Sequence, residues 1–199
     1  MGVHGWRLYD VECSEVEEQL VLQNCTLVGM KGLPTKTARS TEAECGGYDA
    51  SAMWITEETK AMADEDRHPE GSPSPQYHCT CGYYGYRLWP RDRAQNIIFA
   101  HVTCVHPADQ EVENDVVIHA EGWRARWYKI DYIIQPSLVN MPLVEIVASV
   151  ANRMKVTVMP FDHPDGCKEC FSANLEAGRG PRWHEAWTDG RRPDWVKET

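Results

Sequence analysis

The residues best suited to chemistry in this sequence are cysteines and histidines at spacings typical of metal ligands. Cys79 and Cys81 are separated by one residue, and Cys45 and His68 precede them. Thiolate sulfur and imidazole nitrogen are the ligands that zinc takes in structural sites, four at a time in a tetrahedron. The four residues therefore predict a closed structural zinc site, with His78 as the alternative to His68. The competing interpretation is that they are ordinary buried cysteines and loop histidines.

A second pair of thiols, Cys167 and Cys170, has the two-residue spacer of a zinc knuckle. His163 and His184 flank the pair and are candidates for completing a separate small zinc loop. Alternatively, the two thiols complete a four-cysteine site with the central Cys-x-Cys pair. The third interpretation is a pair of free or redox-active thiols in the C-terminal tail.

A basic and aromatic segment is the third candidate site. Arg124 and Arg126 alternate along a predicted hairpin, and Trp127 follows them. Such a surface suits stacking on nucleic-acid bases or pairing with an acidic partner. The alternative is a solvated strand face whose arginines pair with the chain's own carboxylates.

Three tryptophans lie in a polar C-terminal segment, among Gly, Pro, Arg and Asp residues. They are Trp183, Trp187 and Trp195. Because large aromatic side chains in a tail usually anchor on a surface, we expect them to pack on the protein's own body or on a partner.

The motifs of common active sites are missing from the sequence. It contains no Gly-rich phosphate loop, no Gly-x-Ser-x-Gly and no His-Glu-x-x-His. His119 and Glu121 have the first spacing of the zinc deaminase pattern, but Pro-Cys-x-x-Cys does not follow. The sequence therefore favours a protein that is not an enzyme.

The overall charge argues against non-specific binding to nucleic acid. The 199 residues carry a net charge of −10, whereas phosphate binding needs a basic surface. We find no secretion signal and no apolar span for a membrane, which predicts a cytoplasmic protein. In that compartment cysteines stay reduced, so metal binding or free thiols are favoured over disulfides. Cys13, Cys25 and Cys104 lie in predicted strands and are interpreted as core-filling residues.

Hydrophobic periodicity predicts an α+β fold, a mainly antiparallel sheet with one principal helix and loops held by zinc. Residues 1–160 form the predicted domain, and residues 161–199 form a polar, Trp-rich extension that is either clipped by metal or partly disordered. The predicted strands are 6–11, 20–30, 97–105, 116–120, 123–130 and 156–159, and the predicted helices are 142–154 and, less regular, 50–64.

Several short motifs resemble uncharacterised proteins of actinobacteria and their phages. They are Gly5-Trp6-Arg7, Cys45, His68-Pro69, the run from Cys79 to Tyr84, Gly122-Trp123-Arg124-Ala125 and the segment 144–160. The resemblance implies an α+β domain with a Cys/His metal site, and it supplies no activity.

These features together predict a non-catalytic, structurally zinc-stabilised protein-interaction module of phage origin that acts on a host or phage protein. Two alternatives belong to other classes. One is a nucleic-acid-associated regulator that uses the Arg/Trp hairpin. The other is a zinc-dependent hydrolase or nuclease, which needs an open coordination position near His119 or His163.

Overall fold

The computed structural model describes residues 2–16, 19–29, 34–40, 75, 82–89, 97–105, 116–136 and 141–179. These residues form a mainly antiparallel sheet with two helices, which confirms the predicted α+β class. The principal helix was predicted and the second one was not. Several predictions lie outside the described residues, namely the helix over 50–64 and the site residues Cys45, His68, His78, Cys79, Cys81, Trp183, His184, Trp187 and Trp195.

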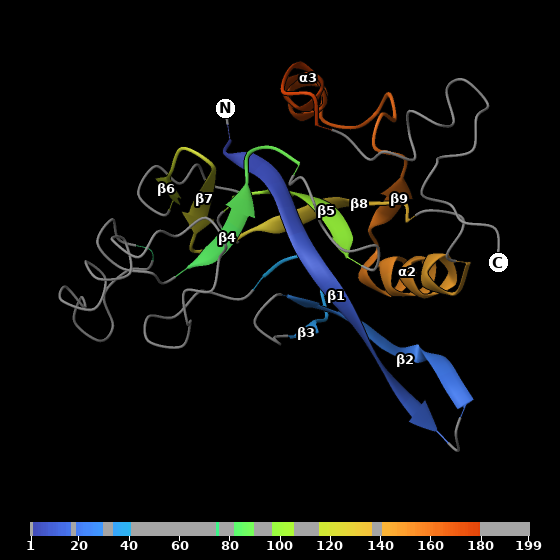
Figure 1. The fold of residues 1–199 in the computed structure, drawn as a ribbon. Helices are drawn as coiled ribbons and strands as arrows, with labels where there is room; N and C mark the ends of the chain where they lie inside the picture. Colours follow the sequence, from blue (N-terminus) through green and yellow to red (C-terminus); the bar gives the residue numbers. More distant parts are fainter. Residues whose placement is uncertain are drawn as a thin grey trace, which may run out of the picture.

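The sheet has nine strands, and its main path runs in the order β6-β7-β4-β1-β5-β8-β9 (Figure 1). Strand β2 pairs with β1, and β3 pairs with β2. Among the described strands, only β8 and β9 pair in parallel, and α2 lies between them in the chain. The strands are β1 (His4–Val16), β2 (Gln19–Gly29), β3 (Pro34–Thr35), β4 (Tyr83–Tyr86), β5 (Ile98–Thr103), β6 (Val116–Ile118), β7 (Gly122–Ala125), β8 (Lys129–Ile134) and β9 (Thr157–Met159).

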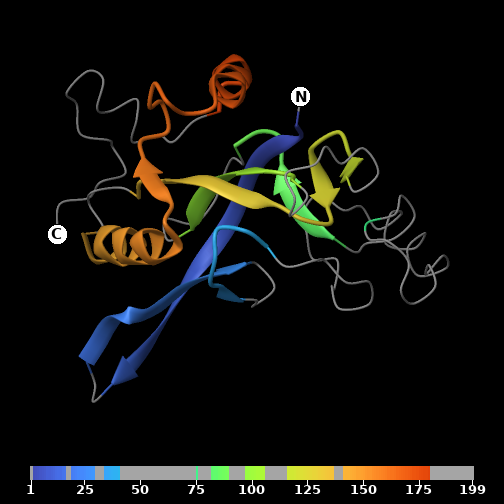
Figure 2. The ribbon, with the colours of Figure 1, turned by 180° about the vertical axis from the view of Figure 1, so that it is seen from behind.

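Strand β1 belongs to two parts of the molecule. Its first half pairs with β5, ending at the pair Tyr9 and Ile98. From Tyr9 onward it pairs instead with β2. Both views show this second half leaving the body as a long two-stranded arm (Figures 1 and 2).

One face of the sheet is covered by α2 (Met141–Met154). The predicted apolar stripe of this helix, which includes Val147 and Val150, is buried against Tyr9, Ile98 and other sheet residues. Side chains of a strand alternate between the two faces, so this core takes one set of β1 and β5 residues and leaves the other set for the opposite face. Among the described residues, no helix combines the length and apolarity that crossing a membrane requires.

The opposite face carries an aromatic core and the second helix, α3 (Lys168–Glu176). Trp6 stacks on Phe161 with ring centroids 5.5 Å apart, and Cys170 of α3 is buried in the same cluster. Asn174 is also fully buried, where its amide donates to the Cys170 carbonyl and accepts from the Trp89 backbone N–H. The first part of the predicted C-terminal extension therefore packs on the sheet.

Two glycines make room for the buried Trp123 ring. A Cβ atom at Gly85 would overlap three atoms of that ring, and one at Gly5 would overlap the Tyr86 carbonyl oxygen and lie 2.9 Å from the ring Nε1. Three neighbouring strands, β1, β4 and β7, meet at this point. Close approach of backbone and ring therefore explains both glycines.

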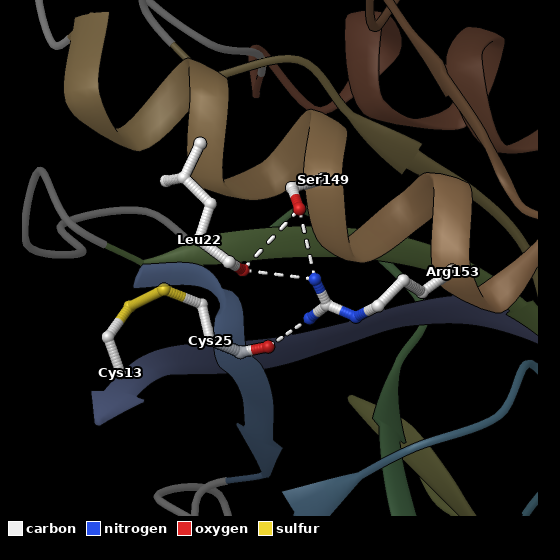
Figure 3. The surroundings of a disulfide bond; sticks show 5 residues. All are labelled: Cys13, Leu22, Cys25, Ser149 and Arg153. Carbon is white, nitrogen blue, oxygen red and sulfur yellow. Dashed lines mark hydrogen bonds between the residues drawn. A yellow bond between two sulfur atoms is a disulfide. The ribbon is translucent and has the colours of Figure 1, made fainter. Parts of the chain in front are cut away.

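A disulfide joins Cys13 and Cys25 in the arm, where the two residues face each other across β1 and β2 (Figure 3). Cys25 is buried, as predicted for a core-filling residue, but the disulfide shows that the expectation of reduced thiols was wrong for Cys13 and Cys25. Next to it, Arg153 of α2 donates to the carbonyls of Leu22 (3.0 Å) and Cys25. The helix thereby binds backbone groups of β2.

Candidate metal centre

Three elements bring two histidines and two cysteines together on the α3 face of the sheet. His4 lies on β1, His101 on β5, and Cys167 and Cys170 at the start of α3. In the register of β1 and β5, His4 is opposite Thr103, so His101 is its diagonal neighbour. Both histidines share the face of Trp6, because His4 is two residues from it in β1 and His101 is paired directly opposite it in β5.

The potential ligand atoms of these four residues all lie within 4.8 Å of one another. The Cys167 sulfur is 3.1 Å from His4 Nδ1, and the Cys170 sulfur is 3.8 Å from the same atom. Zinc bonds of about 2.0–2.3 Å in a tetrahedron put ligand atoms roughly 3.3–3.8 Å apart. The four atoms are therefore spaced to bind one tetrahedral metal ion after small adjustments.

His101 is oriented by a carboxylate. Its Nδ1 lies 2.9 Å from Asp131 Oδ2, which also accepts from the Thr103 hydroxyl at 2.6 Å. The other ring nitrogen, Nε2, is buried and has no hydrogen-bond partner among the described residues. Because a proton on Nδ1 leaves Nε2 with a lone pair, this arrangement prepares Nε2 as a metal ligand.

His4 has the same arrangement with its ring nitrogens exchanged. Its Nε2 lies 3.1 Å from Glu169 Oε2, and its Nδ1 faces the two sulfurs. A carboxylate on the outer nitrogen of a ligating histidine is common in metal sites because it fixes the ring and its tautomer. Each imidazole of the cluster therefore has one nitrogen held by a carboxylate and one directed into the cluster.

The start of α3 fixes the two thiols. Cys167 is the N-cap, and its sulfur accepts from the Cys170 backbone N–H at 3.5 Å. The Cys167 N–H donates to the Tyr132 hydroxyl at 3.0 Å, and the Tyr132 ring lies parallel to His101 with centroids 4.9 Å apart. The helix start is thus attached to the histidine through one tyrosine.

Burial, followed by the charge of the neighbouring Cys167 sulfur, raises the pKa of the Cys170 thiol. The metal-free thiol therefore keeps its proton at neutral pH. Cysteine binds metal as the thiolate, so metal binding at this centre should release protons.

The predicted ligands divide into two groups. Cys167 and Cys170 belong to the cluster, but their partners are His4 and His101, which the sequence did not indicate. His163 is near Cys167, since both line one pocket, but it is not a member of the cluster, and its Nδ1 lies 3.8 Å from Asp165 Oδ2. The central Cys45, His68, Cys79 and Cys81 group lies outside the described residues, so that site stays a prediction.

The predicted basic surface of the hairpin is partly buried in the structure. Arg124 is only 1% exposed, and its Nε donates to His119 Nε2 at 3.1 Å. Burial lowers the pKa of both groups, and the Arg124 charge lowers that of His119 further. Arg126 lies over the Trp127 ring, 4.4 Å from its centroid, and both are partly exposed.

Comparison of the chain with family models, curated proteins and solved structures gave no match. The resemblance to actinobacterial and phage proteins therefore stays a prediction.

Proposed function

We propose that this protein is a non-catalytic interaction module whose fold is stabilised by one zinc ion bound to His4, His101, Cys167 and Cys170. The observation that carries the proposal is the set of four nitrogen and sulfur atoms within 4.8 Å of one another. Two imidazoles and two thiolates match the composition of structural zinc sites.

A structural role is favoured by the number and charge of the ligands. Four protein ligands fill a tetrahedral zinc ion and leave no position for a catalytic water. His101 is 3% exposed and Cys170 is 6% exposed, which limits the approach of a substrate. The hydrolase alternative needs three ligands and an open position, and these four residues do not favour it.

The expected work of the metal is to join distant parts of the chain. His4 and Cys170 lie at opposite ends of the described sequence, and their packing depends on a short helix with few buried residues. Only Cys170 and Asn174 of α3 are buried. Four metal bonds would stabilise the packing of α3 on the sheet, which its small apolar contact alone stabilises weakly.

The arm formed by the outer halves of β1 and β2 is our candidate for the interaction element. It extends from the body in both views (Figures 1 and 2), and Asp10 and Glu12 are exposed on it. With a net charge of −10, the protein suits a basic partner, which we propose is a host or phage protein. The nucleic-acid alternative is weakened because Arg124 is buried.

The metal part of the proposal is tested by elemental analysis and cobalt substitution. We expect zinc in the purified protein, and the loss of one equivalent in Cys170→Ser. Cobalt in the centre should give the absorption of a four-coordinate S₂N₂ ion, unchanged by added azide. An azide-dependent spectrum would indicate an open position and support the hydrolase alternative.

The interaction part needs a separate experiment. Bacterial lysate is passed over wild-type protein and over the Asp10→Lys, Glu12→Lys variant, in which both exposed carboxylates are reversed. We expect the variant to lose partners of basic character. Identical partners on both columns would exclude the acidic arm as the interaction element.

A further inference from the structure

A pocket of about 200 Å³ lies directly beside the metal centre. Phe161 and Phe171 contribute apolar walls, with ring centroids 5.5 Å apart. Cys167 also lines the pocket, while Cys170, His4 and His101 do not. One of the four proposed ligands therefore borders a space of the size of a small organic molecule.

From this arrangement we propose that Cys167 is a modification site, at which a small, soft electrophile enters the pocket and alkylates the metal-bound thiolate. The inference rests on the metal centre proposed above. It adds a chemical class of ligand, small alkylating agents, and a reacting atom, the Cys167 sulfur.

Access distinguishes Cys167 from the other thiols of the described chain. Cys170 and Cys104 are 6% and 4% exposed, whereas Cys167 is partly exposed. A reagent reaches a buried thiol only after local opening of the structure. Cys167 needs no such opening because the pocket already borders it.

Reactivity also favours Cys167. The thiolate is the nucleophilic form of cysteine, and a metal ligand is held in that form without an added base. The one hydrogen bond to this sulfur from a backbone N–H of the described chain comes from Cys170, at 3.5 Å, an ordinary length for a sulfur acceptor. A thiolate sulfur has three lone pairs, so one hydrogen bond and one metal bond leave the third for attack on an electrophile.

In the reaction with iodoacetamide, one bond forms and one bond breaks. A lone pair of the Cys167 sulfur forms the new S–C bond, and the C–I bond breaks with its electron pair leaving as iodide. No proton is released because the ligand is already a thiolate. The product is a neutral thioether, a weaker ligand than the thiolate, so alkylation should weaken metal binding and the attachment of α3.

The experiment treats the full-length, zinc-loaded protein with iodoacetamide and follows each cysteine by peptide mass spectrometry. Released zinc is measured in parallel with a chromogenic chelator. We expect Cys167 to react at least about tenfold faster than Cys170 and Cys104, because about 1.4 kcal/mol of local opening already costs a factor of ten. Zinc release should follow Cys167 alkylation one for one.

A reagent of different size serves as the matched control. Iodoacetamide joined to a fluorescein group carries the same reactive carbon but exceeds a pocket of about 200 Å³, and it should lose the preference for Cys167. Equal rates at Cys167 and Cys170 in a zinc-loaded protein would overturn the modification site and leave the metal centre standing. Equal reaction of Cys167 with both reagents would overturn the pocket as the route. A protein without zinc would overturn both proposals.

Discussion

Replacing Cys170 by Ser tests the metal centre with a change of a single side-chain atom. The chain offers a matched control, because Cys104 is equally buried, at 4% compared with 6%, and lies outside the cluster. Both substitutions put a hydroxyl where a thiol was buried. Only Cys170→Ser removes a proposed metal ligand.

The expected magnitudes follow from this difference. A buried hydroxyl without a good partner costs about 1–3 kcal/mol in either variant. A ligand present at a thousand times its Kd stabilises the folded state by about 4 kcal/mol. If the loss of one thiolate weakens zinc binding by that factor, Cys170→Ser loses about 4 kcal/mol more than Cys104→Ser in excess zinc.

Urea unfolding in buffered zinc and in excess chelator measures both the cost of the buried hydroxyl and the stabilisation by bound zinc. We expect chelation to destabilise wild type and Cys104→Ser by the same amount and Cys170→Ser by much less. A second metal site elsewhere in the chain would affect all three proteins equally, so the difference is preserved. An equal response to chelator in Cys104→Ser and Cys170→Ser would refute the assignment of Cys170.

His101→Gln extends the test to the imidazole ligands. Chelator should destabilise this variant as little as it destabilises Cys170→Ser, because the substitution removes the imidazole that Asp131 orients. A full response in this variant, together with a reduced one in Cys170→Ser, would mean that the thiols bind metal with other partners. The four-cysteine arrangement with the central Cys-x-Cys pair would then be favoured.

Three further changes have defined outcomes. Gly85→Ala should cost about 1–3 kcal/mol in urea unfolding, because its methyl group overlaps the Trp123 ring; an unchanged midpoint would contradict this packing. Reducing the Cys13–Cys25 disulfide should cost up to about 3 kcal/mol for a loop of this length, and mass spectrometry of the alkylated, unreduced protein should show neither thiol modified. A chain ending at Pro160 should still unfold cooperatively but bind one zinc fewer by elemental analysis; an unchanged zinc content would place the metal elsewhere.

The elements with strong local patterns were predictable from the sequence. The apolar stripe of α2, the alternation in β1 and the β-branched and aromatic residues of β5 are recognised from residues close together in the chain. Helix α3 gives little such evidence because only Cys170 and Asn174, four residues apart, are buried. A single buried pair on a short polar helix does not form a recognisable stripe, so this segment was assigned to a polar extension.

The metal ligands also differ in whether a local sequence pattern indicates them. Cys167 and Cys170 were predicted because their spacing is local. His4 and His101 were not, because their proximity depends on the register of β1 and β5, which no single strand specifies. Alternation alone places His4 on the face of Trp6, but it does not say which strand lies beside it.

Arg124 shows where alternation gives the wrong expectation. An arginine between apolar residues in a strand is normally a solvent-facing position. All four residues of β7 are buried, however, so side chains on both faces of this strand are covered. The guanidinium is accommodated by His119, a neighbour that becomes available only when β6 and β7 form their hairpin.

Strand β1 carries both candidate cross-links, one near each end. His4 belongs to the metal cluster, and Cys13 forms the disulfide of the arm. Nine residues of extended strand separate them by roughly 30 Å, so changes at one should add to changes at the other without coupling. The two cross-links also differ in chemistry, because a disulfide needs oxidised sulfur and a zinc centre needs thiolates. Burial reconciles them at Cys170, because oxidation needs access to the sulfur and this residue is buried, whereas Cys167 stays accessible to small reagents.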